Sequence, residues 1–280
     1  MFNRATINPV RRLDRANLAR LSRSAAGGPP ATPDAETKEM RAASAEEPRK
    51  AAIADAKRLL RLSRTAALAT LGADGSPLTT WVGCASDFDG APLFLLSTLA
   101  RHTKDLAGDA RGSLLLTSPP DRGDPLNHPR LTIGGPIAPH PDPHARKRYL
   151  QRNPKAKLYA SFTDFAIYRM RVEAVHFNGG FGRADKLVPA DILTPSADAT
   201  ALIDAEEALL AEINATGGLA AQLARRREAG RRVWRAIGLD AEGLDLSAGG
   251  AAARVDYPAP AFEPQTWRAR LADAVTASLA

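Results

Sequence analysis

FLLSTLARHTKDL, residues 94–106, joins an apolar run to a basic, polar segment. Its first part has the short, continuous apolar character of a buried strand. The second part predicts a helix over residues 99–108, and the first turn of that helix carries Arg101, His102, Thr103 and Lys104. Because a helix start presents unpaired N–H groups and the positive end of the peptide dipole, these side chains predict a site for a phosphate-bearing ligand.

Arg101 is the strongest phosphate candidate in this stretch. A guanidinium group holds two phosphate oxygens in parallel and stays charged at any physiological pH. The alternative interpretation is that a basic helix start forms only a solvated surface.

Composition limits the class of protein. The chain has 280 residues, 44% hydrophobic and 25% charged, which is ordinary for a globular protein. No run approaches the roughly 20 apolar residues of a membrane span, so we expect no membrane partner. The single cysteine fits a reducing cytoplasm, where we expect the protein to lie. The net charge of +7 is not concentrated in one stripe and only 5% of residues are aromatic, so we expect no nucleic-acid partner.

The single cysteine, Cys84, excludes an intrachain disulfide and a multi-cysteine metal site, and its β-rich surroundings indicate a small core residue. His140 and His144 have i, i+4 spacing but flank two prolines, so we expect no metal site. The chain contains no nucleophile elbow and no Walker loop.

Short apolar segments separated by tight turns predict a β-rich core. The expected strands cover residues 65–71, 78–85, 92–97, 113–117, 130–138 and 165–177. Helices are expected at residues 46–63, 99–108 and 144–153. Many short strands with few helices favour a barrel or a sandwich.

Four parts are expected along the chain. Residues 1–45 form an extension, 46–190 the β-rich domain, 191–200 a linker, and 201–280 a small α+β domain with helices at 201–214, 219–229 and 264–279 and strands at 232–239 and 252–257. The Arg-rich, acid-poor extension is similar to an organelle transit peptide, and a disordered extension or an upstream start codon ahead of Met40 are the alternatives.

Four segments in register resemble the flavin-binding split-barrel family of pyridoxamine 5'-phosphate oxidase, in its haem-utilisation (HugZ-like) branch. They are Ala67–Leu71 with the turn at residues 74–77, the run from Ser97 to Leu106, the segment PRLTIGG at residues 129–135, and residues 164–184. The resemblance covers residues 50 to 190 and, more faintly, the rest of the chain. It implies a six-stranded antiparallel split β-barrel with flanking helices, a small C-terminal α+β domain, a homodimer and bound FMN.

The resemblance also implies the cofactor-binding residues. Ala100-Arg101-His102 stands where the oxidases have Ser-Arg-Lys, and the haem-utilisation branch prefers the histidine. The implied FMN contacts are Thr79, Thr80, Ser97, Arg101, His102, Thr103, Lys104 and Arg130. For the two threonines, a half-buried strand face is the equal alternative.

Haem is the other cofactor that the branch suggests. Its members are expected to ligate iron through a histidine in the C-terminal tail, but no histidine follows His176 here. The vitamin B6 oxidase clamp, an Arg-x-His near the C-terminus, is also missing from residues 267–271.

We therefore expect an FMN-binding flavoprotein that acts as an oxidoreductase on a small-molecule substrate or electron acceptor, because a flavin supplies the redox chemistry while the protein orients it. The alternatives are a haem-binding or haem-degrading protein and a non-catalytic flavin or haem carrier or sensor.

Overall fold

The computed structural model describes residues 35–117, 123–180, 183–224 and 233–279. The chain divides into two compact units, residues 1–47 and 48–280. Of the extension expected at residues 1–45, residues 1–34 lie outside the described residues. Helix α2, Ala35–Leu62, begins 11 residues before the expected helix start at residue 46. All other described helices and strands belong to the second unit.

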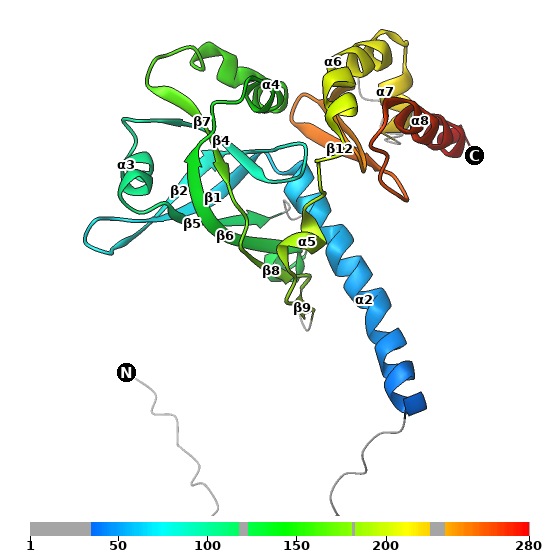
Figure 1. Ribbon diagram of the computed structural model, residues 1–280, viewed down its shortest axis with the longest axis horizontal. Coiled ribbons are helices and arrows are strands. Elements are labelled where there is room, and N and C mark those ends of the chain that lie inside the picture. Colours follow the sequence, from blue (N-terminus) through cyan, green and yellow to red (C-terminus); the bar gives the residue numbers. More distant parts are fainter. Residues whose placement is uncertain (1–34, 118–122, 181–182, 225–232, 280) are drawn as a thin grey trace, which may run out of the picture. The chain divides into compact units, whose positions relative to one another are not determined.

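A curled antiparallel sheet forms the centre of this unit (Figure 1). Its strands are β1 Thr65–Leu71, β2 Pro77–Gly83, β3 Ala85–Ser86, β4 Pro92–Ser97, β5 Arg111–Thr117, β6 Arg130–Pro139, β7 Phe165–Met170, β8 Ala174–Asn178 and β9 Ala184–Asp185. They follow the order β2-β1-β5-β6-β7-β4-β3, with β8 paired to β6 and β9. The predicted split-barrel class is confirmed, although the sheet has nine strands where six were expected.

The long strand predicted over residues 165–177 is wrong, because the chain breaks there into β7 and β8. The first half of β6 pairs with β5 and β8, and its second half pairs with β7. Gly135 lies at this changeover, where an added Cβ would stand 1.9 Å from the carbonyl oxygen of Arg171. Only a glycine allows that close backbone approach, so Gly134-Gly135 is the point at which the sheet curls.

The core of the sheet is apolar. Strand β4 is buried along its whole length except at Ser97, as its sequence predicts. Helix α2 contributes Ala52, Ala56, Leu59 and Leu60 to the same core. These positions recur at helical spacing, so one stripe of the helix is buried against the strands.

The remaining helices flank the sheet or form the C-terminal region. They are α3 Arg101–Gly108, α4 Pro143–Arg152, α5 Pro189–Ile192, α6 Thr200–Ala215, α7 Leu219–Leu223 and α8 Pro264–Leu279. Two short 3-10 helices, η1 Pro125–Asn127 and η2 Pro154–Leu158, lie in loops. Among the described residues, no helix is both long and apolar enough to span a bilayer.

The C-terminal region has its own sheet and core. Strands β10 Arg235–Asp240, β11 Gly243–Ala248 and β12 Ala251–Asp256 form an antiparallel sheet around a core that includes the fully buried Trp267. No strand was expected between residues 240 and 251, where Asp245, Gly243 and Gly249-Gly250 are typical of turns. In the structure Asp245 is buried and accepts a hydrogen bond from Arg254 at 2.9 Å.

Buried ion pairs join this region to α2 and α4. Arg148 donates to Glu206 at 2.6 Å and to the carbonyl of Leu239 at 2.7 Å. Arg61 lies 3.2 Å from Asp240, and all four charged side chains are at most 6% exposed. Since an unpaired charge in such a position is strongly unfavourable, these pairs fix which elements meet.

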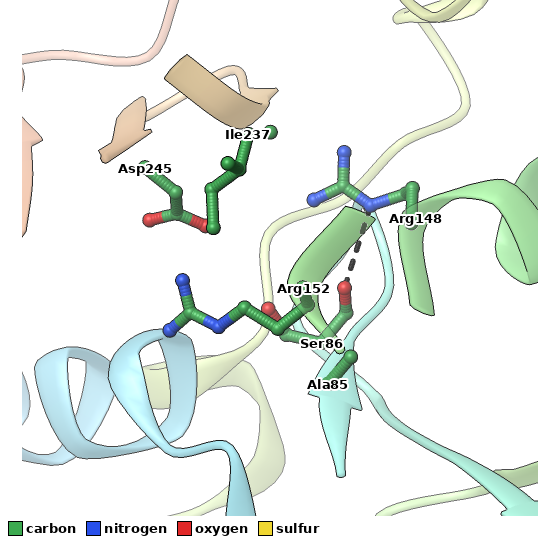
Figure 2. A pocket seen from close by; sticks show the side chains of 7 residues that line it. Ala85, Ser86, Arg148, Arg152, Ile237 and Asp245 are labelled. Carbon is green, nitrogen blue, oxygen red and sulfur yellow. Dashed lines mark hydrogen bonds between the residues drawn. The ribbon is translucent and has the colours of Figure 1, made fainter. Parts of the chain in front are cut away.

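A small cavity of about 10 Å³ lies beside these pairs. Figure 2 shows Arg148, Arg152 and Asp245 around it, with Arg148 hydrogen-bonded to the carbonyl of Ser86 at 3.4 Å. That volume accommodates a single water molecule and no cofactor.

Candidate functional site

Arg101 begins helix α3, which follows the end of the buried strand β4. Its Nε donates to Asp105 Oδ1 at 2.8 Å, which raises the pKa of Arg101 and lowers the pKa of Asp105. Asp105 also accepts a hydrogen bond from Thr70 of β1 at 3.1 Å. The Arg101 side chain is 65% exposed. Asp105 thus anchors the arginine through Nε, Asp74 adds a second nearby negative charge, and the side chain stays largely exposed to a ligand.

A glycine makes room for this arginine. A Cβ on Gly72, in the β1–β2 turn, would stand 3.0 Å from Arg101 Nη2. The turn therefore lies against the guanidinium, and a larger residue at position 72 would need the flexible end of the Arg101 side chain to shift.

The N-terminus of α3 has no capping side chain. Ala100 occupies the N-cap position, and the first turn contains no acidic residue. Thr103 is 3% exposed, and its Oγ1 has no hydrogen-bond partner among the described residues. Lys104 is exposed on the same turn. Arg101 and Lys104 thus lie exposed on the first turn of an uncapped helix, an arrangement that favours an anion.

His102 turns toward the sheet. Its Nδ1 lies 3.2 Å from Thr80 Oγ1, and partial burial lowers the pKa of the imidazole. A histidine with a lowered pKa is neutral at pH 7, so His102 contributes a hydrogen-bonding group and no charge. The structure thus brings Thr80 of β2 to the start of α3.

Two other predicted contacts lie differently. Ser97 Oγ donates to Asp164 at 2.5 Å and accepts from the backbone N–H of Leu99 at 3.1 Å, so it is engaged in holding the β4–α3 connection. Thr79 is exposed, and because side chains alternate along a strand it lies on the face opposite to Thr80.

Arg130 is not brought to Arg101. It opens β6, opposite Thr117 at the end of β5, and its Nη1 donates to the carbonyl of Leu126 at 2.8 Å. The start of α3 lies instead near the end of β1, at the opposite end of these strands. Within one chain, therefore, Thr80 and the residues of the first turn of α3 lie together, Thr79 faces away from them, and Arg130 lies at the other end of the strands.

A groove of about 460 Å³ lies on the outer face of the sheet. It is lined by Ser113, Thr132, Gly134, Ala174, Val175, His176 and Lys186. His176 is exposed and stands opposite Thr132 in the register of β6 and β8. The small residues beside it leave the imidazole accessible.

The other reactive side chains contribute no site. Cys84 is 3% exposed, and burial raises the pKa of its thiol to about 12, which confirms it as a core residue. His144 lies 2.6 Å from Glu206 in the buried ion-pair region. Within the described ranges, no group of three or more His, Cys, Asp or Glu side chains is placed to hold a metal ion.

Sequence reasoning missed the residues that hold Arg101 in place. The i, i+4 spacing of Arg101 and Asp105 was a usable indication of their pairing. The contribution of Thr70, which is 35 residues away in the sequence, depends on the packing of α3 against β1 and had no local indication.

Comparisons with known proteins identify relatives of this chain. The family model described as pyridoxamine 5'-phosphate oxidase matches residues 53–179. The crystal structure of Atu2129 from Agrobacterium tumefaciens str. C58, a protein of unknown function, is 36% identical with a TM-score of 0.70, covering 79% of this chain and 94% of that one.

Two further relatives are related to haem by name. The chloroplastic non-canonical heme oxygenase HOZ of Arabidopsis thaliana is 32% identical over 114 residues, which cover 40% of this chain and 34% of that protein. The match thus spans about a third of the length of this curated relative. A heme binding protein from Mycobacterium smegmatis is 26% identical over 82% of this chain and 97% of its own, but its TM-score of 0.47 is too low to support an argument.

The matched residues contain β1, β2 and the whole β4–α3 segment that positions Arg101. With the curled antiparallel sheet and a relative that shares most of both chains, this shows that the chain belongs to the pyridoxamine 5'-phosphate oxidase-like split-barrel family.

Proposed function

We propose that this chain is a flavoprotein that binds FMN with its phosphate at the start of α3. The observation that supports the proposal is the uncapped helix N-terminus with the anchored Arg101 beside it. Bound FMN would supply redox chemistry, and the protein would act as an oxidoreductase on a small molecule.

The proposal includes a homodimer. On the outer face of the sheet, Trp81 is 68% exposed and Leu115 is 39% exposed, although both are large apolar side chains. Arg130 lies too far along the strands to join Arg101 in the same chain. A second copy against this face would cover the apolar side chains, and it would give Arg130 a role at the partner's cofactor.

The test compares FMN with riboflavin, which has the same ring system and no phosphate. We expect wild-type protein to prefer FMN, and Arg101→Ala to reduce FMN affinity about tenfold or more while leaving riboflavin affinity unchanged, the scale of a lost charge-assisted contact. Arg111→Ala is the matched control, because Arg111 is an exposed arginine paired with Asp109 at the start of β5. Equal FMN affinity in wild-type and Arg101→Ala protein would contradict the proposal.

Haem is a second candidate, and the exposed His176 in the outer groove favours it. A neutral imidazole is a common axial ligand of haem iron. The 32% identity to a plant heme oxygenase over 114 residues supports the same candidate. The C-terminal tail contains no histidine, so the ligand in this function would be His176 in the outer groove, with His102 or a non-histidine ligand as the alternatives.

The haem candidate predicts a Soret band on reconstitution with hemin, and the loss or shift of that band in His176→Ala. His140→Ala serves as the control, since His140 lies outside this groove beside Asp142. Breakdown of the bound haem with a reductant would indicate a haem-degrading enzyme. Binding of either cofactor without turnover would indicate a carrier or sensor.

A further inference from the structure

A second and larger cleft lies in the C-terminal region, between β12, α7 and α8, with Arg58 of α2 at its edge. Its volume is about 590 Å³. Small-molecule sites in proteins have volumes of about 300 to 1,000 Å³. The cleft therefore has the size of a ligand site, and it contains none of the residues at the start of α3 or beside His176.

Its walls are mostly apolar and small. The apolar lining residues are Leu223, Ala224, Ala252, Ala253, Val255, Pro258, Ala274 and Ala277. Four alanines from β12 and α8 supply little side-chain volume, and this keeps the cleft open. Such a lining suits the apolar body of a small ligand.

Two polar groups in this cleft lack partners. Tyr257 is 8% exposed, and its hydroxyl has no hydrogen-bond partner among the described residues. The Nε of Arg270, on α8, is buried and equally without a partner. Buried polar groups in folded proteins are almost always hydrogen-bonded, so two such groups on residues that line one cleft are candidate donors to a ligand.

The ring of Tyr257 is held in place by its neighbours. It packs against Trp267 with ring centroids 5.6 Å apart, and its backbone N–H donates to the carbonyl of Glu242 at 2.8 Å. The hydroxyl position is therefore set before any ligand binds.

Of the other charged residues that line the cleft, Arg58, Arg254 and Asp256 are already paired. Arg254 pairs with Asp240, Asp245 and Asp256, and Arg58 lies 3.2 Å from Asp256. Asp273 is exposed. The donors without a partner are thus the Tyr257 hydroxyl and the Arg270 Nε–H, both of which can donate to an anionic oxygen.

We propose that this cleft binds a small amphipathic carboxylate, whose carboxylate accepts hydrogen bonds from Tyr257 and Arg270 and whose apolar chain lies along the alanines of β12 and α8. The site is separate from the proposed FMN site and does not depend on it. No covalent step is involved.

Calorimetric titration of the full chain with sodium octanoate tests the site, with 1-octanol as the uncharged probe. We expect octanoate to bind more tightly than octanol. Tyr257→Phe keeps the ring and removes the hydroxyl, and Arg270→Met keeps a chain of similar length and removes the donor. Each should weaken octanoate about tenfold, the scale of one hydrogen bond to a charged group, and leave octanol unchanged.

Two controls make the result decisive. Arg268→Met lies on the same helix at an exposed position paired with Glu212, and it should leave octanoate affinity unchanged. Ala274→Leu fills the cleft without touching either donor, and it should weaken both probes. Absence of octanoate binding to wild-type protein, or equal affinity in wild-type, Tyr257→Phe and Arg270→Met proteins, would overturn the proposal.

Discussion

Replacing Glu206 by Gln should destabilise the fold strongly at neutral pH. Glu206 is 4% exposed and accepts hydrogen bonds from Arg148 at 2.6 Å and from the backbone N–H of Leu239 at 3.1 Å. Burial alone would raise the pKa of this carboxyl, but Arg148 and His144 hold it below its usual value. The substitution removes the negative charge and leaves the buried Arg148 without its closest anion.

The magnitude follows from that burial. Removing one partner of a buried ion pair costs about 3 to 5 kcal/mol, and because Gln retains one acceptor we expect about 3 kcal/mol here. For a unit of this size, that corresponds to a fall in melting temperature of roughly 6 to 12 °C. Glu207→Gln is the matched control, since Glu207 is the next residue, 75% exposed, and pairs with Lys147 on the surface. We expect less than about 1 kcal/mol from the control.

The pH dependence gives a second readout of the same substitution. Because the pKa of Glu206 is lower in the folded chain than its unfolded value near 4.5, ionised Glu206 stabilises the fold above that pH. The contribution is lost as the pH falls through the folded-state pKa, so the gap between wild-type and Glu206→Gln should narrow in acid. Thermal melts followed by circular dichroism at several pH values measure both effects. Equal melting temperatures for the Glu206→Gln and Glu207→Gln variants at pH 7 would refute the reasoning.

Three further outcomes follow from the fold. Gly135→Ala should lower stability by about 1 to 3 kcal/mol or more in a denaturant titration, because the added Cβ would stand 1.9 Å from a backbone oxygen, whereas Gly108→Ala has open space and should be tolerated. Cys84 should resist iodoacetamide in the folded protein and react only after unfolding, since burial raises its pKa to about 12; rapid labelling of native protein would contradict this. Trp81→Glu should shift the sedimentation profile from dimer to monomer, because Trp81 is 68% exposed on the face proposed for a second copy, and an unchanged profile would count against that interface.

The part of the fold that the sequence predicted best is the part set by local pattern. The apolar run of β4 and the polar first turn of α3 are adjacent in the chain, so both were placed close to their observed positions. Helix α8, observed over Pro264–Leu279, was predicted with the same bounds because its proline start and its length define it.

The errors have long-range causes. The break between β7 and β8 arises because β6 pairs with β8 in its first half and with β7 in its second half. The pattern of apolar residues at 165–177 does not indicate this change of partner. Strand β11 was missed since Asp245 is stabilised by Arg254, a residue on the next strand, and not by solvent. From the sequence alone, a polar residue that is buried against its partner cannot be distinguished from a turn residue.

The candidate site also combines residues that local sequence predicts with residues whose position depends on the fold. Arg101, Thr103 and Lys104 were predictable because one helix start carries them all. Thr80 reaches the site through its strand register, whereas Thr79 faces the other way by the alternation of the same strand. Arg130 was grouped with them by resemblance alone, and one chain does not bring it there.

The most direct test of the proposed function is the absorption spectrum of purified protein after incubation with FMN and, separately, with hemin, each followed by removal of unbound cofactor. We expect bound FMN with the bands of oxidised flavin, at one cofactor per chain, and the loss of this binding in Arg101→Ala. A stoichiometric Soret band together with no retained flavin would contradict the FMN proposal and leave haem at His176 as the function to pursue.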